Sequence, residues 1–338
     1  MKVGITGAAG GIGSCLSDAL YERGIETVLI DNLSGGSLEN FQHKDNADSV
    51  KNVDIRDSAQ LLPLLSEVDV IVHLAAISSL AACQKNPVDA FSVNVSGTAS
   101  CVNIATKTGA KLIFASTSAV YENTKTLPFR EDDFIQPSLV YPMTKKFSED
   151  LLFGLQLTND LNFLNLRFFN VFGPRQDVKR ANPPLINYLV REHVLGRKPK
   201  IYAPLSQARD YVHVFDIIEM IMKFIDSKDA YPNRTYNVCS GRAISIAEIF
   251  TSLELGFGEQ IPFEQGEPSF LWEMHAELFD GALPLKLQVV EKETLKESIG
   301  NPERSANEFS WTARRNVLEE IANSVPEMRN RVALAFGS

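Results

Sequence analysis

The sequence predicts an α/β protein with a doubly wound parallel sheet, helices on both faces of that sheet, and a smaller mixed α/β lobe toward the C-terminus. Three observations predict this fold class. Apolar segments of strand length alternate with helical patterns through the first half of the chain. A glycine-rich turn follows the first strand, and an acidic residue ends the second. After Gly173 and Pro174 the segments are shorter and no longer alternate strictly, which marks the start of the smaller lobe.

The glycine turn occupies the segment VGITGAAGGIG, residues 3–13, between a strand pattern and a helical pattern. Glycines leave room for a pyrophosphate to approach the backbone, and the N–H groups that begin a helix attract its negative charge. A tight strand-to-helix turn without a ligand is the alternative interpretation. The candidate cofactor residues in this segment are Gly7, Gly10, Gly11, Ile12 and Gly13.

Asp31 follows a second buried strand, residues 27–30, and lies 18 positions after Gly13. A carboxylate about 20 residues beyond the glycine turn is placed to accept hydrogen bonds from an adenosine ribose. No Lys or Arg lies between Glu26 and Lys44, so a ribose 2′-phosphate would meet acid and no base. The strands, the turn, the helix and the acid together indicate a Rossmann dinucleotide site that prefers NAD to NADP.

The alternation continues along the chain. Residues 68–75, 111–116 and 162–169 are apolar runs of strand length. Residues 87–108 predict a long helix, bounded by Pro87 and Gly109, and residues 141–157 predict an amphipathic one. We therefore predict a dinucleotide-binding domain over residues 1–174 and a smaller substrate-binding lobe over residues 175–338. The segments 209–214 and 236–240 are candidates to return to the first sheet, and residues 265–300 show the weakest pattern.

Composition limits the functional classes. The 338 residues carry a formal net charge of −9, which argues against broad binding to nucleic acid or to an anionic membrane. No run approaches the roughly 18 apolar residues of a membrane span, and the N-terminus begins as a strand rather than a signal peptide. These features predict a cytoplasmic protein. The cysteines form no CxxC pair, which favours reduced core thiols over a metal site or disulfides; they are Cys15, Cys83, Cys101 and Cys239.

A candidate acid–base pair lies at the start of the second predicted helix. In YPMTK, Tyr141 and Lys145 are four residues apart and share a helix face, so the lysine ammonium would lower the pKa of the phenol. The phenol would then serve as a base for an alcohol near neutral pH. Thr117 and Ser118 follow a predicted strand at the edge where parallel sheets bind ligands, so either hydroxyl can orient that alcohol. An ordinary surface helix start and ordinary strand-end caps are the alternatives.

With these residues in place, the chain resembles the extended short-chain dehydrogenase/reductase family, specifically its nucleotide-sugar epimerases and dehydratases. The resemblance covers residues 2–241 in order and fades toward residue 321. The glycine spacing fits both GxxGxxG and GxxxGxG, but the chain length and the RDYVHV block indicate an extended member. The matching stretches are TGAAGGIG, DNLSGG, VDIRD, HLAA, NVSGT, STSAVY, YPMTK, LRFFNVFGPRQ, RDYVHVFD and YNVCSG.

The resemblance implies roles for the matching residues. It implies Thr117, Tyr141 and Lys145 as the catalytic residues and Arg209 as the partner of a substrate pyrophosphate, with an ion pair to Asp210 or Asp216 as the alternative. The implied cofactor contacts, besides the glycine turn, Asp31, Tyr141 and Lys145, are Asn32, Ser34, Asp54 and Ile55 at the adenosine, Leu74, Ala75 and Ala76 along the channel, and Asn94, Ser116 and Phe168. Asn94 would also support a helix and an active-site water. The implied substrate contacts are Thr117, Ser118, Ala119, Asn170, Tyr202 and Arg209.

Three other polar residues are expected to be structural. His73 ends an apolar strand, where its ring would satisfy backbone groups, and His213 lies inside RDYVHV. Asp210 is expected to accept hydrogen bonds rather than to act as an acid.

The chain also departs from the family pattern. Glu122 and Pro142 stand where glycine is usual, although proline suits the first turn of a helix. The segment IYAPLS, residues 201–206, replaces a glycine-acid-glycine loop. A late arginine-glycine-acid block, which supplies a second phosphate cation, is not recognisable; its nearest match is Gly266-Glu267-Pro268, and the candidates to replace its cation are Arg304, Arg314 and Arg315.

The resemblance implies a reaction that begins with oxidation at C4 of a hexose, with Tyr141 taking the hydroxyl proton and NAD taking the hydride. Related 4,6-dehydratases carry an Asp-Glu pair after the catalytic threonine, whereas this chain has Ser118 and Ala119, and alanine cannot move a proton. We therefore expect an NAD-dependent nucleotide-sugar 4-epimerase with a transient 4-keto intermediate. A dehydratase or another 4-keto-forming enzyme is the alternative, and a non-catalytic dinucleotide sensor is a third. The resemblance also implies a homodimer formed by the two predicted helices.

Overall fold

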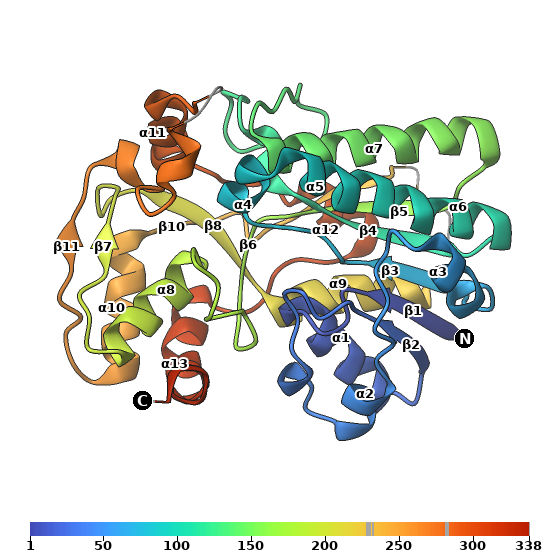
Figure 1. The fold of residues 1–338 in the computed structure, drawn as a ribbon, viewed down its shortest axis with the longest axis horizontal. Coiled ribbons are helices and arrows are strands. Elements are labelled where there is room, and N and C mark those ends of the chain that lie inside the picture. Colours follow the sequence, from blue (N-terminus) through green and yellow to red (C-terminus); the bar gives the residue numbers. More distant parts are fainter. Residues whose placement is uncertain (228–230, 232, 281–283, 338) are drawn as a thin grey trace.

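The computed structural model describes residues 1–227, 231, 233–280 and 284–337. Its centre is a six-stranded sheet in the order β2-β1-β3-β4-β5-β9, and each neighbouring pair of strands is parallel (Figure 1). This sheet confirms the predicted fold class. The strands are short and mostly buried, as expected for a sheet covered on both faces. Their bounds are β1 Lys2–Thr6, β2 Glu26–Ile30, β3 Val70–His73, β4 Lys111–Thr117, β5 Phe163–Phe168 and β9 Thr235–Val238.

Helices cover both faces of the sheet (Figure 1). On one face, α1 (Gly11–Glu22) and α9 (Val214–Asp226) bury apolar side chains such as Leu16 and Ile221 against the strands. On the other face, α3 (Ser58–Leu65), α6 (Thr98–Thr108) and α7 (Val140–Asn159) contribute Leu61, Val102 and Leu152 to a separate apolar cluster. The two apolar clusters cover opposite faces of the sheet. A strand with few polar side chains is therefore stable only at the centre of the fold, where both of its faces are buried.

The helix predicted over residues 87–108 has three parts. It begins as α5 (Pro87–Phe91), continues as a π-helical segment over Ser92–Gly97, and ends as α6 at Gly109, which has a φ of +75°. The π-helical segment widens the helix where Asn94 turns inward. The Asn94 amide bonds both backbone groups of Ile77 and the hydroxyl of Thr144 on α7. The interruption therefore ties the helix to the loop after β3.

A smaller lobe surrounds a three-stranded sheet in the order β10-β8-β6, formed by β6 (Asn170–Phe172), β8 (Ala208–His213) and β10 (Ala243–Ser245). Its apolar core includes Leu189, Ile249 and Ile321. These residues come from α8 (Leu185–Val194), α10 (Ile246–Phe257) and α13 (Val317–Phe336). The remaining elements are α2 Lys44–Ser49, α4 Leu80–Lys85, α11 Leu287–Leu295, α12 Glu303–Phe309, and the paired strands β7 Lys200–Ile201 and β11 Glu264–Gln265.

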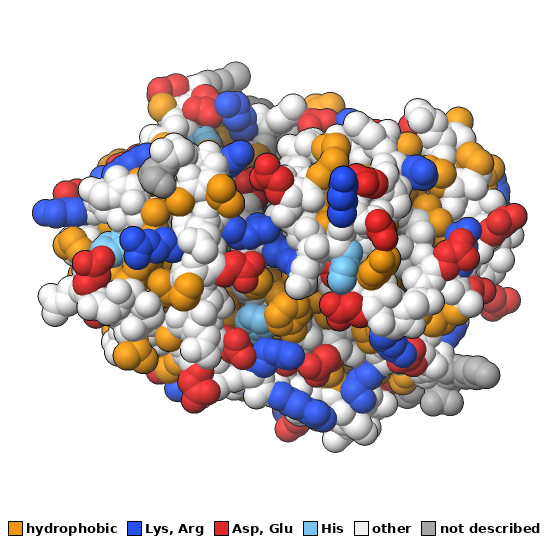
Figure 2. Space-filling view, turned by 90° about the horizontal axis from the view of Figure 1, so that it is seen from below, with side chains coloured by type: hydrophobic (Ala, Val, Ile, Leu, Met, Phe, Trp, Pro, Cys, Tyr) orange, Lys and Arg blue, Asp and Glu red, His pale blue; other side chains and the backbone are white. Residues whose placement is uncertain are grey.

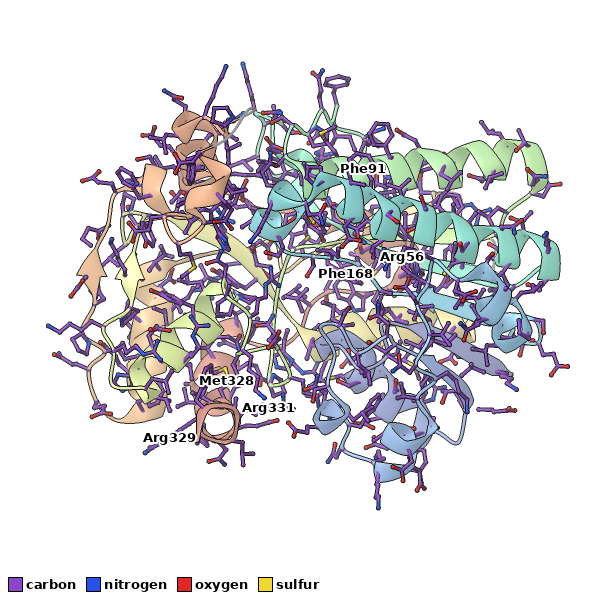
Figure 3. All side chains as sticks on the ribbon, in the orientation of Figure 1. Arg56, Phe91, Phe168, Met328, Arg329 and Arg331 are labelled. Atoms are coloured by element: carbon purple, nitrogen blue, oxygen red, sulfur yellow. The ribbon has the colours of Figure 1, made fainter. Side chains whose placement is uncertain are left out.

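The chain crosses between the two parts more than once. Of the two segments predicted as candidates to return, β9 joins the six-stranded sheet, whereas β8 belongs to the smaller sheet. Phe309 and Trp311 pack into the core of the larger part. Arg331 on α13 also reaches back, and its guanidinium donates a 2.9 Å hydrogen bond to Asn40 (Figure 3). Segments after residue 174 therefore return to the first domain, and the predicted boundary at that residue stays a prediction.

Positive and negative side chains are interspersed over the face shown in Figure 2. All four cysteines are buried and free. Among the described residues, no helix combines the length and the apolar character that a membrane crossing requires.

Candidate functional site

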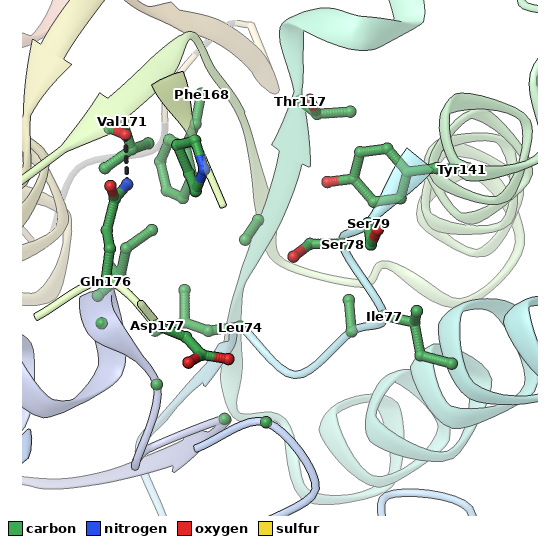
Figure 4. A pocket seen from close by; sticks show the side chains of 18 of the residues that line it. Leu74, Ile77, Ser78, Ser79, Thr117, Tyr141, Phe168, Val171, Gln176 and Asp177 are labelled. Carbon is green, nitrogen blue, oxygen red and sulfur yellow. Dashed lines mark hydrogen bonds between the residues drawn. The ribbon is translucent and has the colours of Figure 1, made fainter. Parts of the chain in front are cut away.

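A cavity of about 900 Å³ lies beyond the carboxyl ends of β1, β3, β4 and β5, and the loop after β6 forms its opposite wall (Figure 4). A second cavity of about 440 Å³ adjoins it in the smaller lobe and shares several lining residues with it. Parallel sheets bind their ligands at this edge. The predicted site residues that line the first cavity are Gly7, Gly10, Gly11, Ile12, Gly13, Asp31, Asn32, Ser34, Ile55, Leu74, Ala75, Ala76, Ser116, Thr117, Ser118, Ala119, Tyr141, Lys145, Phe168, Asn170 and Arg209.

The glycine turn forms one end of the cavity. Gly7 has a φ of +74°, and a Cβ placed there would lie 2.7 Å from the backbone nitrogen of Ala75. A Cβ on Gly13 would lie 2.1 Å from the carbonyl oxygen of Gly7, so only glycine fits either position. Gly10 begins α1 without a side-chain cap, which leaves the first N–H groups of the helix for an anion. The glycine turn and the start of α1 therefore fit the pyrophosphate of NAD.

Asp31 lies beside the glycine turn. Its carboxylate accepts hydrogen bonds from the backbone nitrogens of Ala9, at 2.9 Å, and Leu33, at 2.8 Å. Burial raises the pKa of Asp31, while both of these bonds lower it. The carboxylate oxygens keep further lone pairs for ribose hydroxyls, so the observed geometry is compatible with the predicted contact.

Asp54 is not among the residues that line the cavity, although its neighbours Val53 and Ile55 are, so its contact with the adenine stays a prediction. The guanidinium of Arg56 lies 2.7 Å from its carboxylate, and Asn32 donates to the same group at 3.1 Å. The hydrogen bonds from Arg56 hold the pKa of Asp54 at about 2. Arg56 itself lines the cavity and was missed by sequence analysis, although it lies in the quoted VDIRD stretch. Figure 3 shows Arg56 and Phe168 toward the middle of the molecule.

Asn94 is likewise absent from the cavity wall. It is buried, and its amide is saturated by Ile77 and Thr144. The structural support predicted for Asn94 is therefore present, whereas a direct contact with the cofactor is not supported by the geometry. Ser116 lines the cavity, but its hydroxyl donates to Glu149 at 2.5 Å.

The candidate catalytic residues meet at the other end of the cavity. Tyr141 lies in the first turn of α7 and its hydroxyl faces the cavity, near Thr117 at the end of β4 (Figure 4). The side chain of Thr117 lowers the pKa of the phenol. Lys145 is buried one turn further along α7, and its ammonium donates to the carbonyl oxygen of Ala115 at 2.8 Å. The three residues are thus brought together as predicted.

The predicted acidity of Tyr141 is wrong for the protein by itself. Burial raises its pKa to about 12, and the cation that opposes this shift is Arg180 rather than Lys145. Burial also lowers the pKa of Lys145 to about 8. Helical spacing correctly places both side chains on one face, but the lysine ammonium is committed to a backbone carbonyl.

Glu122 holds the start of α7, a role that sequence analysis missed. Its carboxylate accepts hydrogen bonds from the backbone nitrogens of Ser138, at 2.8 Å, and Leu139, at 2.9 Å. Leu139 precedes the helix and has no capping side chain of its own. An acid is also favourable at a helix N-terminus. The signal was the departure from glycine at position 122, and the acid there positions the turn that carries Tyr141.

A buried ion pair lies behind the same site. Arg167 on β5 meets Glu149 on α7 at 2.7 Å and donates to the hydroxyl of Tyr121 at 2.8 Å. Burial raises the pKa of Glu149, but Arg167 brings it below its ordinary value. Because Glu149 also accepts from Ser116, this pair fixes α7 against the strand that ends at Thr117.

Arg209 reaches the cavity, but its alternative partner was predicted wrongly. Its guanidinium lies 3.6 Å from the carboxylate of Glu293 and donates to the Glu293 carbonyl at 2.6 Å. Asn170 donates to the carbonyl of Asp210 at 2.7 Å. Tyr202 lines the second cavity rather than the first, and its hydroxyl bonds Glu273 at 2.7 Å.

Asp210, His73 and His213, which were predicted to be structural, all form hydrogen bonds within the fold. The carboxylate of Asp210 accepts from the backbone nitrogens of Ser240, Gly241 and Gly300. His73 is buried, but its ring bonds the hydroxyls of Thr6 and Thr98 instead of backbone groups. His213 accepts from the nitrogen of Phe215 and caps α9.

None of the three arginines proposed to replace the missing cation lines either cavity. Arg304 pairs with Asp132, Arg315 pairs with Asp216, and the backbone of Arg314 contacts Asp216. The nearest sequence match, Gly266, packs against the ring of Tyr202. The segment 265–300 nevertheless contributes to the site. The cavity-lining residues that sequence analysis missed include Arg175, Gln176, Asp177, Arg180, His275, Glu293, Lys296 and Ser298.

Comparisons with known proteins agree with this geometry. A family model described as the NAD dependent epimerase/dehydratase family matches residues 3–239. The chain is 31% identical over 263 residues to a putative UDP-glucose 4-epimerase of Methanocaldococcus jannaschii, covering 76% of this chain and 84% of that protein. It is 27% identical over 267 residues to UDP-glucuronic acid decarboxylase 1 of Xenopus tropicalis, covering 78% of this chain and 62% of that longer protein. Among solved structures, it resembles the UDP-glucose 4-epimerase of Thermotoga maritima with UDP-glucose, with a TM-score of 0.84 and 25% identity over 98% of this chain and 100% of that one.

Proposed function

Because the chain belongs to the NAD-dependent epimerase/dehydratase family, we propose that it is a nucleotide-sugar 4-epimerase acting through a transient 4-keto-hexose. The observation that carries the proposal is that Tyr141 and Thr117 line the same cavity, with Thr117 close enough to lower the pKa of the phenol. The two positions after Thr117 are Ser118 and Ala119, so neither carries a carboxylate. The similarity to UDP-glucose 4-epimerases supports a uridine nucleotide as the carrier.

The proposed roles follow from the contacts. Tyr141 removes the proton from the O4 hydroxyl of the hexose and returns it after the 4-keto sugar has turned over. Thr117 holds the phenol and orients the same hydroxyl by a shared hydrogen bond. The glycine turn, Asp31 and Lys145 would hold NAD, which would supply a hydride acceptor and a positive charge near the phenol. Arg209 is proposed to contact the substrate diphosphate, a task suited to a planar cation.

Burial of Tyr141 decides when its phenol can lose a proton. Since the phenol has a pKa of about 12 in the protein alone, its proton leaves readily only when positive charge is near it. Arg180 already lowers this pKa. The binding of NAD, whose oxidised nicotinamide carries a positive charge, is therefore proposed to prepare the base.

The alternatives differ in the groups they need. Elimination of water across C5 and C6 needs an acid and a base near those carbons. Among the described residues of the first cavity, the carboxylates are Asp31, Asp89, Asp177 and Glu293, and Asp31 and Asp89 lie with the adenosine end of the wall. Loss of a carboxylate from C6 needs only the 4-keto group beside it, so the similarity to decarboxylases keeps that outcome open. A dinucleotide sensor would not need the Tyr141–Thr117 pair.

The test is incubation of the purified protein with UDP-, GDP-, CDP- and dTDP-hexoses, with the products identified by NMR. We expect the 4-epimer of a UDP-sugar. A 4-keto-6-deoxy sugar would establish the dehydratase instead. A lack of product together with no near-ultraviolet absorbance from reduced nicotinamide would favour the sensor. We further propose a cytoplasmic homodimer, with four free buried thiols supporting a reducing compartment.

A further inference from the structure

Arg180 is a partly buried cation that forms no ion pair within 4 Å among the described residues, although Asp177 is near enough to raise its pKa against the lowering effect of burial. It lies on the loop between β6 and α8 and lines both cavities. Its guanidinium contacts Ser78 twice, with Nη1 3.4 Å from the side-chain oxygen and Nη2 3.5 Å from the carbonyl oxygen. Both distances are long for hydrogen bonds. The Nε atom is inaccessible to solvent and has no hydrogen-bond partner.

The other arginines of the cavity wall are paired. Arg56 meets Asp54 and Asp89, Arg175 meets Asp18 at 2.6 Å, and Arg209 meets Glu293. The two lysines also have neighbours that stabilise their charge, since Lys145 donates to Ala115 and Lys296 lies over the ring of Phe129. A guanidinium that is partly desolvated without a counter-ion is costly. Arg180 is therefore the cation in this wall that an anionic ligand would stabilise most.

The position of Arg180 near Tyr141 indicates which carbon of the sugar carries the anionic group. Ser78, its contact residue, lies on the same wall of the cavity as the Tyr141 hydroxyl (Figure 4). Arg180 is also close enough to lower the pKa of that phenol. In the proposed function the phenol acts on O4 of the hexose. C6 is two bonds from C4, whereas the diphosphate is attached at C1, across the ring. An anion at Arg180 is therefore placed better on C6 than on the diphosphate.

Resting on the proposed function, we propose that the substrate is a nucleotide hexuronate whose C6 carboxylate is bound by Arg180, with the hydroxyl of Ser78 as a second donor. A carboxylate is planar and matches the fork of a guanidinium, which donates two parallel hydrogen bonds. Such an anion would also accept a hydrogen bond from the buried Nε–H of Arg180 or from its Nη–H groups. A neutral C6 hydroxymethyl group offers one weaker acceptor and leaves the charge of Arg180 uncompensated.

The test compares UDP-glucuronate with UDP-glucose on the NAD-loaded protein. Turnover is followed by NMR, and equilibrium binding of each sugar nucleotide is measured by calorimetry. For the unchanged protein we expect the higher kcat/KM and the tighter binding with UDP-glucuronate. Arg180→Gln is expected to lower the binding affinity for UDP-glucuronate by about 10- to 100-fold, the effect of a lost charged hydrogen bond, and to change the affinity for UDP-glucose little. Because Arg180 also lowers the pKa of Tyr141, turnover of both sugars is expected to fall in this variant, so affinity is the quantity that separates them. Either product of the uronate, its 4-epimer or the pentose left after loss of CO₂, supports the inference.

A matched control uses the neighbouring residue. Lys179 is exposed and does not line either cavity, so Lys179→Gln removes the same charge from the same loop without removing the proposed contact. Arg180→Lys keeps the charge and loses the fork, and its uronate affinity should lie between those of the unchanged protein and Arg180→Gln. Thermal unfolding of each variant checks that the loop change leaves the fold intact.

The outcomes separate this inference from the proposed function. Turnover of UDP-glucose without a preference for UDP-glucuronate overturns the uronate and leaves the epimerase proposal standing. An equal loss of affinity for both sugars in Arg180→Gln also overturns it, because a contact with the shared diphosphate would give that result. Arg180-dependent binding of UDP-glucuronate without any turnover supports the recognition but contradicts the epimerase. Binding of neither sugar nucleotide overturns both.

Discussion

The ammonium of Lys145 donates a hydrogen bond of 2.8 Å to the carbonyl oxygen of Ala115, two residues before Thr117. This contact joins the first turns of α7 to the end of β4, so it fixes the distance between the two elements that carry the Tyr141–Thr117 pair. It also places a cation in the interior, where burial lowers the pKa of Lys145 to about 8. The energetic cost of that burial can be measured through its pH dependence.

Lys145 is expected to make the protein more stable as the pH rises from about 8 to 10.5, the ordinary pKa of a lysine. In that range the unfolded chain still holds the proton that the folded chain has released, so the free energy of unfolding increases with pH. Denaturant unfolding of the unchanged protein and of Lys145→Met over this range measures the effect as the difference between the two curves. Parallel pH profiles would show that Lys145 does not titrate as the burial predicts.

Tyr141→Phe is expected to lower turnover of the nucleotide sugar by at least about 10²-fold, because the variant keeps the ring but cannot exchange a proton. NAD binding, measured by calorimetry, should change little, since the glycine turn and Asp31 are untouched. Tyr21→Phe is the control, because the Tyr21 hydroxyl bonds Asp45 on the surface, away from the cavity. Retained activity in Tyr141→Phe would remove Tyr141 from the role of base.

Asp31→Ala is expected to weaken NAD binding by about tenfold or more, through loss of the charged acceptor for the ribose hydroxyls. The same change frees the nitrogens of Ala9 and Leu33, so Asp31→Asn, which keeps one acceptor oxygen, should bind NAD with intermediate affinity. Asp48→Ala on the exposed side of α2 is the control. An unchanged dissociation constant for NAD in Asp31→Ala would contradict the ribose contact.

The homodimer is expected to form through α5 and α7. Val88 is 81% exposed and Phe147 is 50% exposed, and the ring of Phe147 lies 5.7 Å from that of Phe91 (Figure 3). Pairing with a second copy would bury this apolar surface. The combined change Val88→Asp and Phe147→Glu should convert a dimer into a monomer in light scattering at micromolar concentration. Leu255→Glu, at an exposed apolar position on α10, should not do so. A monomeric unchanged protein would contradict the expectation.

The sequence by itself determined the elements whose signals are local. The glycine turn, the strand before it and the helix after it follow from glycine geometry and apolar periodicity, and the structure places Gly7, Gly13 and Asp31 together. The i, i+4 spacing likewise predicted that Tyr141 and Lys145 share one side of α7. A resemblance carried by ordered motifs extended these predictions to Thr117, which does meet the phenol.

The tertiary structure alone decided which groups pair. Arg209 meets Glu293, 84 residues away, and Glu122 accepts hydrogen bonds from the backbone just before a helix that begins 18 residues later. No local pattern specifies such contacts, because they depend on how the strands and loops pack. The same is true of the ionisation of Tyr141, since burial raises the pKa of its phenol and the cation that opposes this shift is Arg180 rather than the neighbouring lysine. Arg180 had no motif to mark it, and its position beside Ser78 exists only because the loop after β6 folds across the cavity. Desolvation and pairing are properties of that packing, so they could not be obtained from residue spacing.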